Sequence, residues 1–90
     1  MKGTVKLVGA GCGRGLISIM GVKAIEGAES LVYDDLIDDE LLGYAPSDCK
    51  KIYVGKRYAK HSKTQEEINR ILINEAKAGK RVVRLKGGDS

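Results

Sequence analysis

The sequence predicts an α/β fold, a mainly parallel sheet of four or five strands with flanking helices. Short β-branched and apolar runs alternate with segments in which apolar residues recur every three to four positions, and glycines separate the two kinds of segment. The 90 residues allow one small domain. Apolar residues make up 42% of the chain, charged residues 31%, and there is one proline, which is typical of a folded domain.

The first half of the chain predicts strand, helix and strand in turn. Residues 4–8 are β-branched and apolar and precede Gly9, which predicts a buried first strand. A helix follows the glycine-rich loop and ends around Gly27, because apolar residues there fall near a 3.6-residue period. They are Leu16, Ile17, Met20, Ala24 and Ile25. Residues 30–33 then form a short second strand.

The second half continues the alternation. A brief helical turn at 39–42 leads to a third strand at 51–54. Residues 64–67, Thr-Gln-Glu-Glu, have the spacing of a capping box and start a helix that ends at Gly79. Its apolar positions are Ile68, Ile71, Leu72 and Ala76. A fourth strand at 81–85 follows, so the sheet is parallel with right-handed crossovers.

Composition excludes several classes of protein. No apolar run approaches the roughly 18–20 residues that span a bilayer, so we expect no membrane partner. Residues 1–8 lack the apolar core of a secretory signal, which predicts a cytoplasmic protein. In that compartment Cys12 and Cys49 are expected to be free thiols. Together with one histidine they fall short of the four ligands of a closed zinc site, so no metal is predicted.

The net charge of +4 is unevenly distributed. Acidic side chains crowd residues 34–40, and Lys and Arg follow through residues 50–63 without an intervening acid. The basic stretch is either a solvated surface or an anion-binding rim. With four Tyr and neither Trp nor Phe, a base-stacking surface is poorly supplied, and we expect no nucleic-acid partner. A non-catalytic anion- or nucleic-acid-binding module is kept as an alternative.

Four glycines alternate through residues 9–15, between the first strand and the first helix. Glycines there let the backbone approach a ligand closely, with N–H groups pointing outward. As a dinucleotide fingerprint the loop is incomplete, because Arg14 stands where the third glycine belongs. Asp34, after the second strand, still imitates the ribose-binding acid of a Rossmann unit. A nicotinamide-dinucleotide-binding α/β domain is therefore a second alternative.

Six segments occur in an order and spacing that resembles the N-terminal domain of the tetrapyrrole methylase family. They are residues 8–11, 32–36, 53–57, 61–62, 65–69 and 81–89. Enzymes of that family are much longer, have two α/β domains with the active site in the cleft between them, and act as homodimers. The resemblance implies that residues 1–90 are an N-terminal domain truncated after the turn at 87–89. The second domain would be absent and the fragment inactive alone.

The resemblance also implies an activity, the C-methylation of uroporphyrinogen III to precorrin-2 on the way to sirohaem and cobalamin. S-Adenosylmethionine would be the methyl donor and S-adenosylhomocysteine the product. Such a reaction needs the reactants to be positioned and a proton to be managed. Asp34 matches the proton acceptor of the family and Lys56 its proton donor. Both follow strands, at the edge where parallel sheets bind ligands.

Two turns match the cofactor-binding turns of the family. They consist of Gly11, Cys12 and Gly13 after the first strand and of Gly87, Gly88 and Asp89 after the fourth. A carboxylate there can accept hydrogen bonds from the cofactor's amino group. Since the substrate is a polycarboxylate, the resemblance gives nearby basic residues a substrate-binding role. They are Arg57, Lys60 and His61.

The first of these turns departs from the family pattern Gly-Ala-Gly-Pro-Gly-Asp-Pro-Gly. Cys12 replaces the first proline, Arg14 stands near the aspartate position, and the loop is one residue shorter. After the second turn, Ser90 stands where the family has proline. We therefore expect the shape of the first loop, and with it the affinity for the cofactor, to differ from the family pattern.

Overall fold

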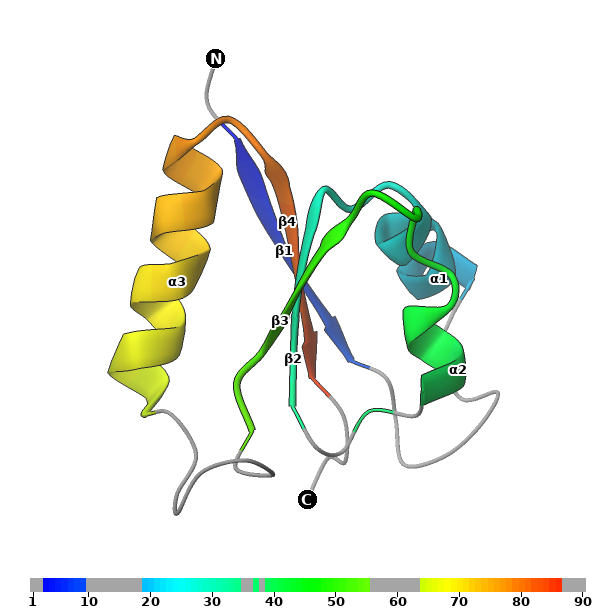
Figure 1. Cartoon of the computed structure of the whole chain (residues 1–90), viewed down its shortest axis with the longest axis horizontal. Helices are drawn as coiled ribbons and strands as arrows, with labels where there is room; N and C mark the ends of the chain where they lie inside the picture. Colours follow the sequence, from blue (N-terminus) through cyan, green and yellow to red (C-terminus); the bar gives the residue numbers. More distant parts are fainter. Residues whose placement is uncertain (1–2, 10–18, 35–36, 38, 56–63, 87–90) are drawn as a thin grey trace.

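The computed structural model describes residues 3–9, 19–34, 37, 39–55 and 64–86. Within these ranges the chain forms a four-stranded, wholly parallel sheet with helices on both faces, which confirms the predicted fold class (Figure 1). The strands are β1 (Thr4–Gly9), β2 (Ser30–Tyr33), β3 (Lys50–Tyr53) and β4 (Arg81–Lys86). The helices are α1 (Ile19–Glu26), α2 (Asp39–Leu42) and α3 (Gln65–Lys77).

The strand order is β1-β4-β2-β3, so β4 lies between the first two strands of the chain. From β1 to β3 the chain moves in one direction across the sheet, with α1 and α2 on one face. From β3 to β4 it moves back, and α3 covers the opposite face (Figure 1). Right-handed crossovers require this arrangement, because reversing the direction of travel moves the connecting helix to the other face.

The core consists of two aliphatic clusters, one on each face of the sheet. Because side chains alternate along a strand, Leu31 faces α1 and α2 whereas Val32 faces α3. The first cluster comprises Ile25, Ala28, Leu31, Ile37, Leu41, Cys49, Val83 and Leu85. The second comprises Val32, Val54, Ile68, Leu72 and Val82. Burial on both faces agrees with the apolar residues of β2 and with Val82, Val83 and Leu85 in the middle of β4.

The ends of α3 confirm the local chemistry predicted from the sequence. The Thr64 hydroxyl accepts the Glu67 backbone N–H at 3.2 Å, and the Glu67 carboxylate accepts the Thr64 N–H at 2.8 Å. At the other end, Gly79 has a φ of 87°, the left-handed conformation that glycine adopts most easily. The helix therefore begins and ends where its capping residues dictate.

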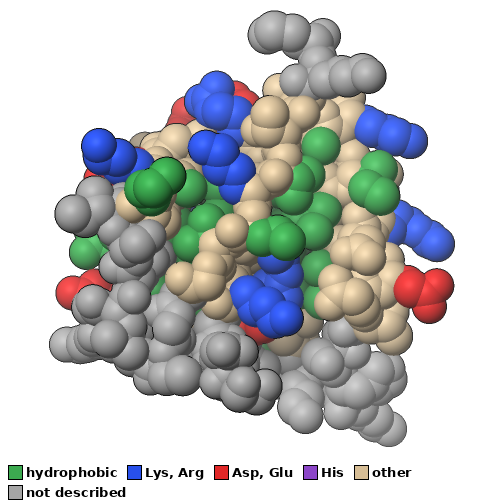
Figure 2. Space-filling model, turned by 180° about the vertical axis from the view of Figure 1, so that it is seen from behind, with side chains coloured by type: hydrophobic (Ala, Val, Ile, Leu, Met, Phe, Trp, Pro, Cys, Tyr) green, Lys and Arg blue, Asp and Glu red, His purple; other side chains and the backbone are tan. Residues whose placement is uncertain are grey.

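The expected burial of the first strand is wrong. β1 is an edge strand that pairs only with β4 among the described residues, and its Val5 and Leu7 side chains are 41% and 77% exposed. Met20 in α1 is 82% exposed, whereas Ile25 is fully buried. Seen from behind, hydrophobic side chains are open to solvent between Lys and Arg side chains (Figure 2). An apolar pattern identifies the strand or helix, but neighbouring elements decide which apolar residues are covered.

In the part of the chain that the structure describes, no helix is long and apolar enough to cross a membrane.

Candidate functional site

The parallel sheet brings the carboxyl ends of its strands to one edge, at the bottom of Figure 1. Gly9 at the end of β1 and Lys86 at the end of β4 are register partners on neighbouring strands. The two glycine-rich turns predicted to bind a cofactor follow these two residues in the sequence. Segments more than 70 residues apart in the chain therefore leave the sheet side by side. Ligands of open α/β sheets bind at this edge.

Among the predicted site residues, Asp34 lies within the described part of the chain. The others lie outside the described residues: Gly11, Cys12, Gly13, Lys56, Arg57, Lys60, His61, Gly87, Gly88 and Asp89. Lys56 follows Gly55, which ends the described stretch after β3, and β3 is the direct neighbour of β2. Asp34 and the start of the segment with Lys56 thus leave adjacent strands.

Asp34 directly follows β2 and is held by its backbone and its side chain. Its carbonyl accepts the Ile37 N–H at 3.4 Å, which closes a turn after the strand. Its carboxylate is 23% exposed, and Oδ2 lies 3.7 Å from Nη2 of Arg84. Arg84 belongs to β4 and is only 6% exposed. The edge therefore carries a partly buried carboxylate next to a buried guanidinium.

Two tyrosines line the sheet just inside this edge. Tyr33 and Tyr53 are register partners on β2 and β3, and their ring centroids lie 5.6 Å apart with the ring planes tilted by 57°. Such tilted contacts between aromatic rings are favourable. The Val54 N–H donates to the Tyr33 carbonyl at 2.8 Å and extends the pairing by one step. These contacts fix the relative positions of the two strand ends beside Asp34.

Sequence reasoning missed Arg84. The signal was present, because Arg84 stands between Val83 and Leu85 in a strand that a parallel sheet covers on both faces. A charged side chain between two apolar residues in the middle of such a strand is expected to be buried, and buried charges are paired. The identity of its partner depends on strand order.

A second charged cluster lies at the opposite, amino-terminal edge of the sheet. Glu75 of α3 accepts a 2.6 Å hydrogen bond from the Ser30 hydroxyl and contacts the Lys50 and Lys80 ammonium groups at 3.2 and 3.4 Å. The Ser30 hydrogen bond is the main cause that lowers the pKa of Glu75. Burial acts in the opposite direction and raises the pKa, whereas the hydrogen bonds from Lys50 and Lys80 lower it further. This cluster attaches α3 to the sheet away from the candidate site.

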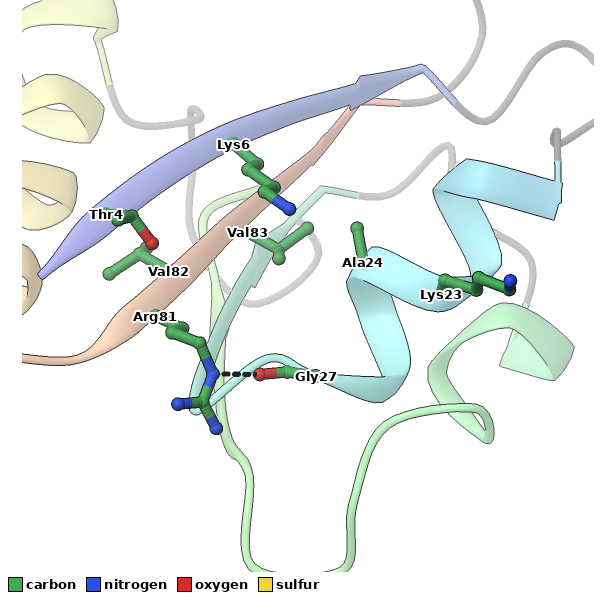
Figure 3. A pocket seen from close by; sticks show the side chains of 8 residues that line it. All are labelled: Thr4, Lys6, Lys23, Ala24, Gly27, Arg81, Val82 and Val83. Carbon is green, nitrogen blue, oxygen red and sulfur yellow. Dashed lines mark hydrogen bonds between the residues drawn. The ribbon is translucent and has the colours of Figure 1, made fainter.

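A cavity of about 320 Å³ also opens away from the carboxyl edge, between α1 and the first halves of β1 and β4 (Figure 3). Its apolar floor includes Ala24 and Val83, and Lys6 and Lys23 flank it. Arg81 at its rim donates through Nε to the Gly27 carbonyl at 2.8 Å. Within the described ranges, no three His, Cys, Asp or Glu side chains gather as metal ligands would.

Cys49 is a packing residue. It is a free, buried thiol within the cluster that faces α1 and α2. Burial raises its pKa, with a smaller opposing influence from Lys51. A thiol of this kind is neutral and unreactive at neutral pH.

Comparison with known proteins gives a consistent result. The family model for tetrapyrrole (corrin/porphyrin) methylases matches residues 4–90. The uroporphyrinogen-III C-methyltransferase of Methanocaldococcus jannaschii is 63% identical over 90 residues, which are 99% of this chain and 37% of the relative. Siroheme synthase 2 of Cronobacter sakazakii is 51% identical over 89 residues, 98% of this chain and 20% of the relative. The chain thus spans well under half the length of these curated relatives.

Solved structures agree. Uroporphyrin-III C-methyltransferase from Thermus thermophilus superimposes with a TM-score of 0.76 at 32% identity, over 98% of this chain and 36% of that one. A structure of the T. thermophilus enzyme complexed with S-adenosyl homocysteine gives 0.71 at 40% identity, over 94% and 32%. A cobalt precorrin-4 methyltransferase gives 0.77 at 26% identity, over 94% and 34%.

Proposed function

The chain belongs to the tetrapyrrole methylase family, and from this premise we propose that it is the N-terminal domain of an S-adenosylmethionine-dependent methyltransferase acting on uroporphyrinogen III. The pairing of Gly9 with Lys86 carries the proposal. Because these residues end the neighbouring strands β1 and β4, the two glycine-rich turns begin next to each other. A single ligand can then contact both turns. The similarity to an enzyme complexed with S-adenosyl homocysteine supports the identity of that ligand.

Residues Gly11–Gly13 and Gly87–Asp89 would hold the cofactor at this edge. Among the described residues, an added Cβ at Gly9 would meet no atom within 4 Å, so the end of β1 is open to close approach at this position. The cofactor supplies a methyl group on a positively charged sulfur. We assign this chain the tasks of binding it, orienting the two reactants and moving a proton.

Asp34 and Lys56 would carry the proton transfers. Methylation of a pyrrole carbon leaves positive charge on the ring, and loss of a proton removes that charge. The Asp34 carboxylate, partly buried at the carboxyl edge, is suited to accept this proton, and the Lys56 ammonium group is suited to donate one. The polycarboxylate substrate would contact Arg57, Lys60 and His61 through opposite charge.

The activity is tested in a full-length chimera, in which this chain replaces its matched segment in the M. jannaschii relative. We expect the chimera to methylate uroporphyrinogen III. Asp34→Asn and Lys56→Gln should each lower kcat by about 10²- to 10⁴-fold, the range for loss of a general acid or base. Asp48→Asn is the control, since Asp48 is an exposed acid away from the edge and its loss should leave kcat unchanged.

A folded chimera without methyl transfer, or an Asp34→Asn variant with the parent rate, would contradict the proposal. Calorimetry on the same chimera separates the alternatives. We expect S-adenosylhomocysteine to bind and NAD not to bind, whereas a nicotinamide-binding domain predicts the reverse. A nucleic-acid-binding module predicts salt-dependent binding of an oligonucleotide.

The assembly and location belong to the same proposal. By resemblance to the family we propose that the full-length enzyme is a cytoplasmic homodimer that serves sirohaem or cobalamin synthesis. Sedimentation of the chimera tests the dimer, and a monomer at assay concentrations would contradict it.

A further inference from the structure

Arg84 of β4 is a buried arginine. Its side chain is 8% exposed and lies on the α3 face of the sheet, the same face as its register partner Val32. A buried guanidinium is costly unless its charge and N–H groups are compensated. Replacing it by an aliphatic residue would continue the apolar pattern of the strand. A buried charge at such a position therefore indicates a partner of opposite charge.

The two ends of the guanidinium fork have different partners. Nη1 donates to the Leu85 carbonyl at 3.0 Å, which anchors the group to its own strand. Nη2 lies 3.7 Å from Oδ2 of Asp34. Asp34 comes two residues after Val32, so the Arg84 side chain reaches along the sheet toward the carboxyl edge. Through Arg84, the central strand β4 thereby contacts the carboxylate of Asp34, which follows the neighbouring strand β2.

We propose that Arg84 is a positioning residue, which holds the Asp34 carboxylate at the carboxyl edge in the orientation that accepts the substrate proton. This inference rests on the proposed function. At 3.7 Å the contact is an ion pair longer than a hydrogen bond, so Arg84 attracts the carboxylate without the short contact of a hydrogen-bonded pair. Arginine suits this task better than lysine, because its planar fork can bind a carbonyl and a carboxylate at once.

A double-mutant cycle in the full-length chimera tests the proposal. We expect Arg84→Gln to lower kcat by about 10- to 100-fold, the size of effect seen when a partner that orients a functional ligand is removed. The KM for S-adenosylmethionine should change by less than about 3-fold. In the Asp34→Asn background, Arg84→Gln should lower kcat by less than about 3-fold, since its effect passes through Asp34.

Two further variants keep the test decisive. Arg84→Lys retains the charge but not the fork, so its kcat should lie between those of the parent and Arg84→Gln. If Arg84→Gln does not fold, the same cycle is measured with Arg84→Lys. Arg81→Gln is the matched control, because Arg81 lies on the same strand but its contacts are with Gly27 and Glu29 at the opposite edge. Its kcat should equal that of the parent.

The results separate the two proposals. If Arg84→Gln lowers kcat equally in both backgrounds, Arg84 has a merely structural role. That result, or a parent-like kcat for Arg84→Gln, would overturn the positioning role of Arg84 and leave the proposed function standing. An inactive parent chimera would overturn the proposed function together with this inference. Parent activity, loss of activity on Asp34→Asn, and a non-additive cycle would support both.

Discussion

At the residue scale, the two edges of the sheet use charged side chains in opposite ways. At the amino-terminal edge, Glu75 of α3 is 15% exposed and contacts Ser30 of β2, Lys50 of β3 and Lys80, which directly precedes β4. Such a saturated carboxylate has a structural role. At the carboxyl edge, Asp34 has one oxygen 3.7 Å from Arg84 and is 23% exposed, so it combines electrostatic support with access from solvent.

The Glu75 cluster predicts how stability depends on pH. Its hydrogen bonds lower the pKa of Glu75 in the folded chain, so the unfolded chain binds the proton more readily. The stabilisation is therefore fully present above the ordinary pKa of about 4.5 and is lost as the pH falls through the lower, folded pKa. Glu75→Gln should lower the free energy of unfolding at pH 7 by about 1–3 kcal/mol, the usual effect for hydrogen bonds to a charged group.

Urea unfolding of the parent and Glu75→Gln between pH 7 and pH 3 measures this effect. The difference between the two proteins should shrink as the pH falls below about 4.5. Glu26→Gln, which removes an exposed carboxylate on α1, should change the unfolding free energy by less than about 0.5 kcal/mol. A Glu75→Gln difference that is constant over this pH range would contradict the assignment.

At the scale of elements, α3 shows how local chemistry defines a helix that tertiary packing then uses. The capping box at Thr64 and Glu67 starts the helix, and Gly79 at φ 87° ends it. Between them Ile68 and Leu72 recur at helical spacing and are the buried residues that pack against the sheet. The N-cap residue Thr64 directly follows the segment 56–63, which contains Lys56.

Removing the N-cap hydroxyl tests the importance of the capping box. Thr64→Ala should lower the free energy of unfolding by about 0.5–2 kcal/mol, because the Glu67 N–H loses its acceptor at the helix start. Thr64→Ser retains the hydroxyl and should stay within about 0.5 kcal/mol of the parent. Thermal unfolding followed by circular dichroism measures both. Equal effects of the two substitutions would show that the methyl group, and not the hydroxyl, stabilises this end.

At the scale of the whole molecule, strand order decides which surfaces are open. β4 is central, covered on both faces and paired on both sides, whereas β1 pairs only with β4 among the described residues. The apolar side chains of β1 are consequently exposed, Leu7 at 77%. An edge strand with exposed apolar side chains is a site for association.

Self-association of the 90-residue chain should therefore depend on Leu7. We expect the chain to form dimers or larger species as its concentration rises, and Leu7→Lys to reduce this by placing a charge on the edge strand. Sedimentation velocity over a range of concentrations measures the change. Met20→Lys is the control, because it adds the same charge at another exposed apolar position, on helix α1 and not on the edge strand. Equal effects of both variants would indicate general charge repulsion instead of association through β1.

The positions of the strands and helices follow from the sequence alone, because the interactions that start and stop them act within a few residues. The capping box at 64–67, the helix stop at Gly79 and the short apolar runs within 30–33 and 81–85 each operate locally, and the structure confirms them. The alternation of these elements also predicted the parallel sheet, since parallel strands require crossover connections. The importance of Asp34 came from the family resemblance together with its place after a strand.

Three findings required the tertiary structure. They are the exposure of β1 and Met20, the pairing of Arg84 with Asp34, and the register of Gly9 with Lys86. Each depends on which elements become neighbours across long stretches of chain, and the period of apolar residues is the same whether a face is covered or open. Arg84 and Asp34 are 50 positions apart and meet only because β4 inserts beside β2. That insertion goes together with the packing of α3 on the face opposite α1, as right-handed crossovers require, and both are properties of the assembled sheet.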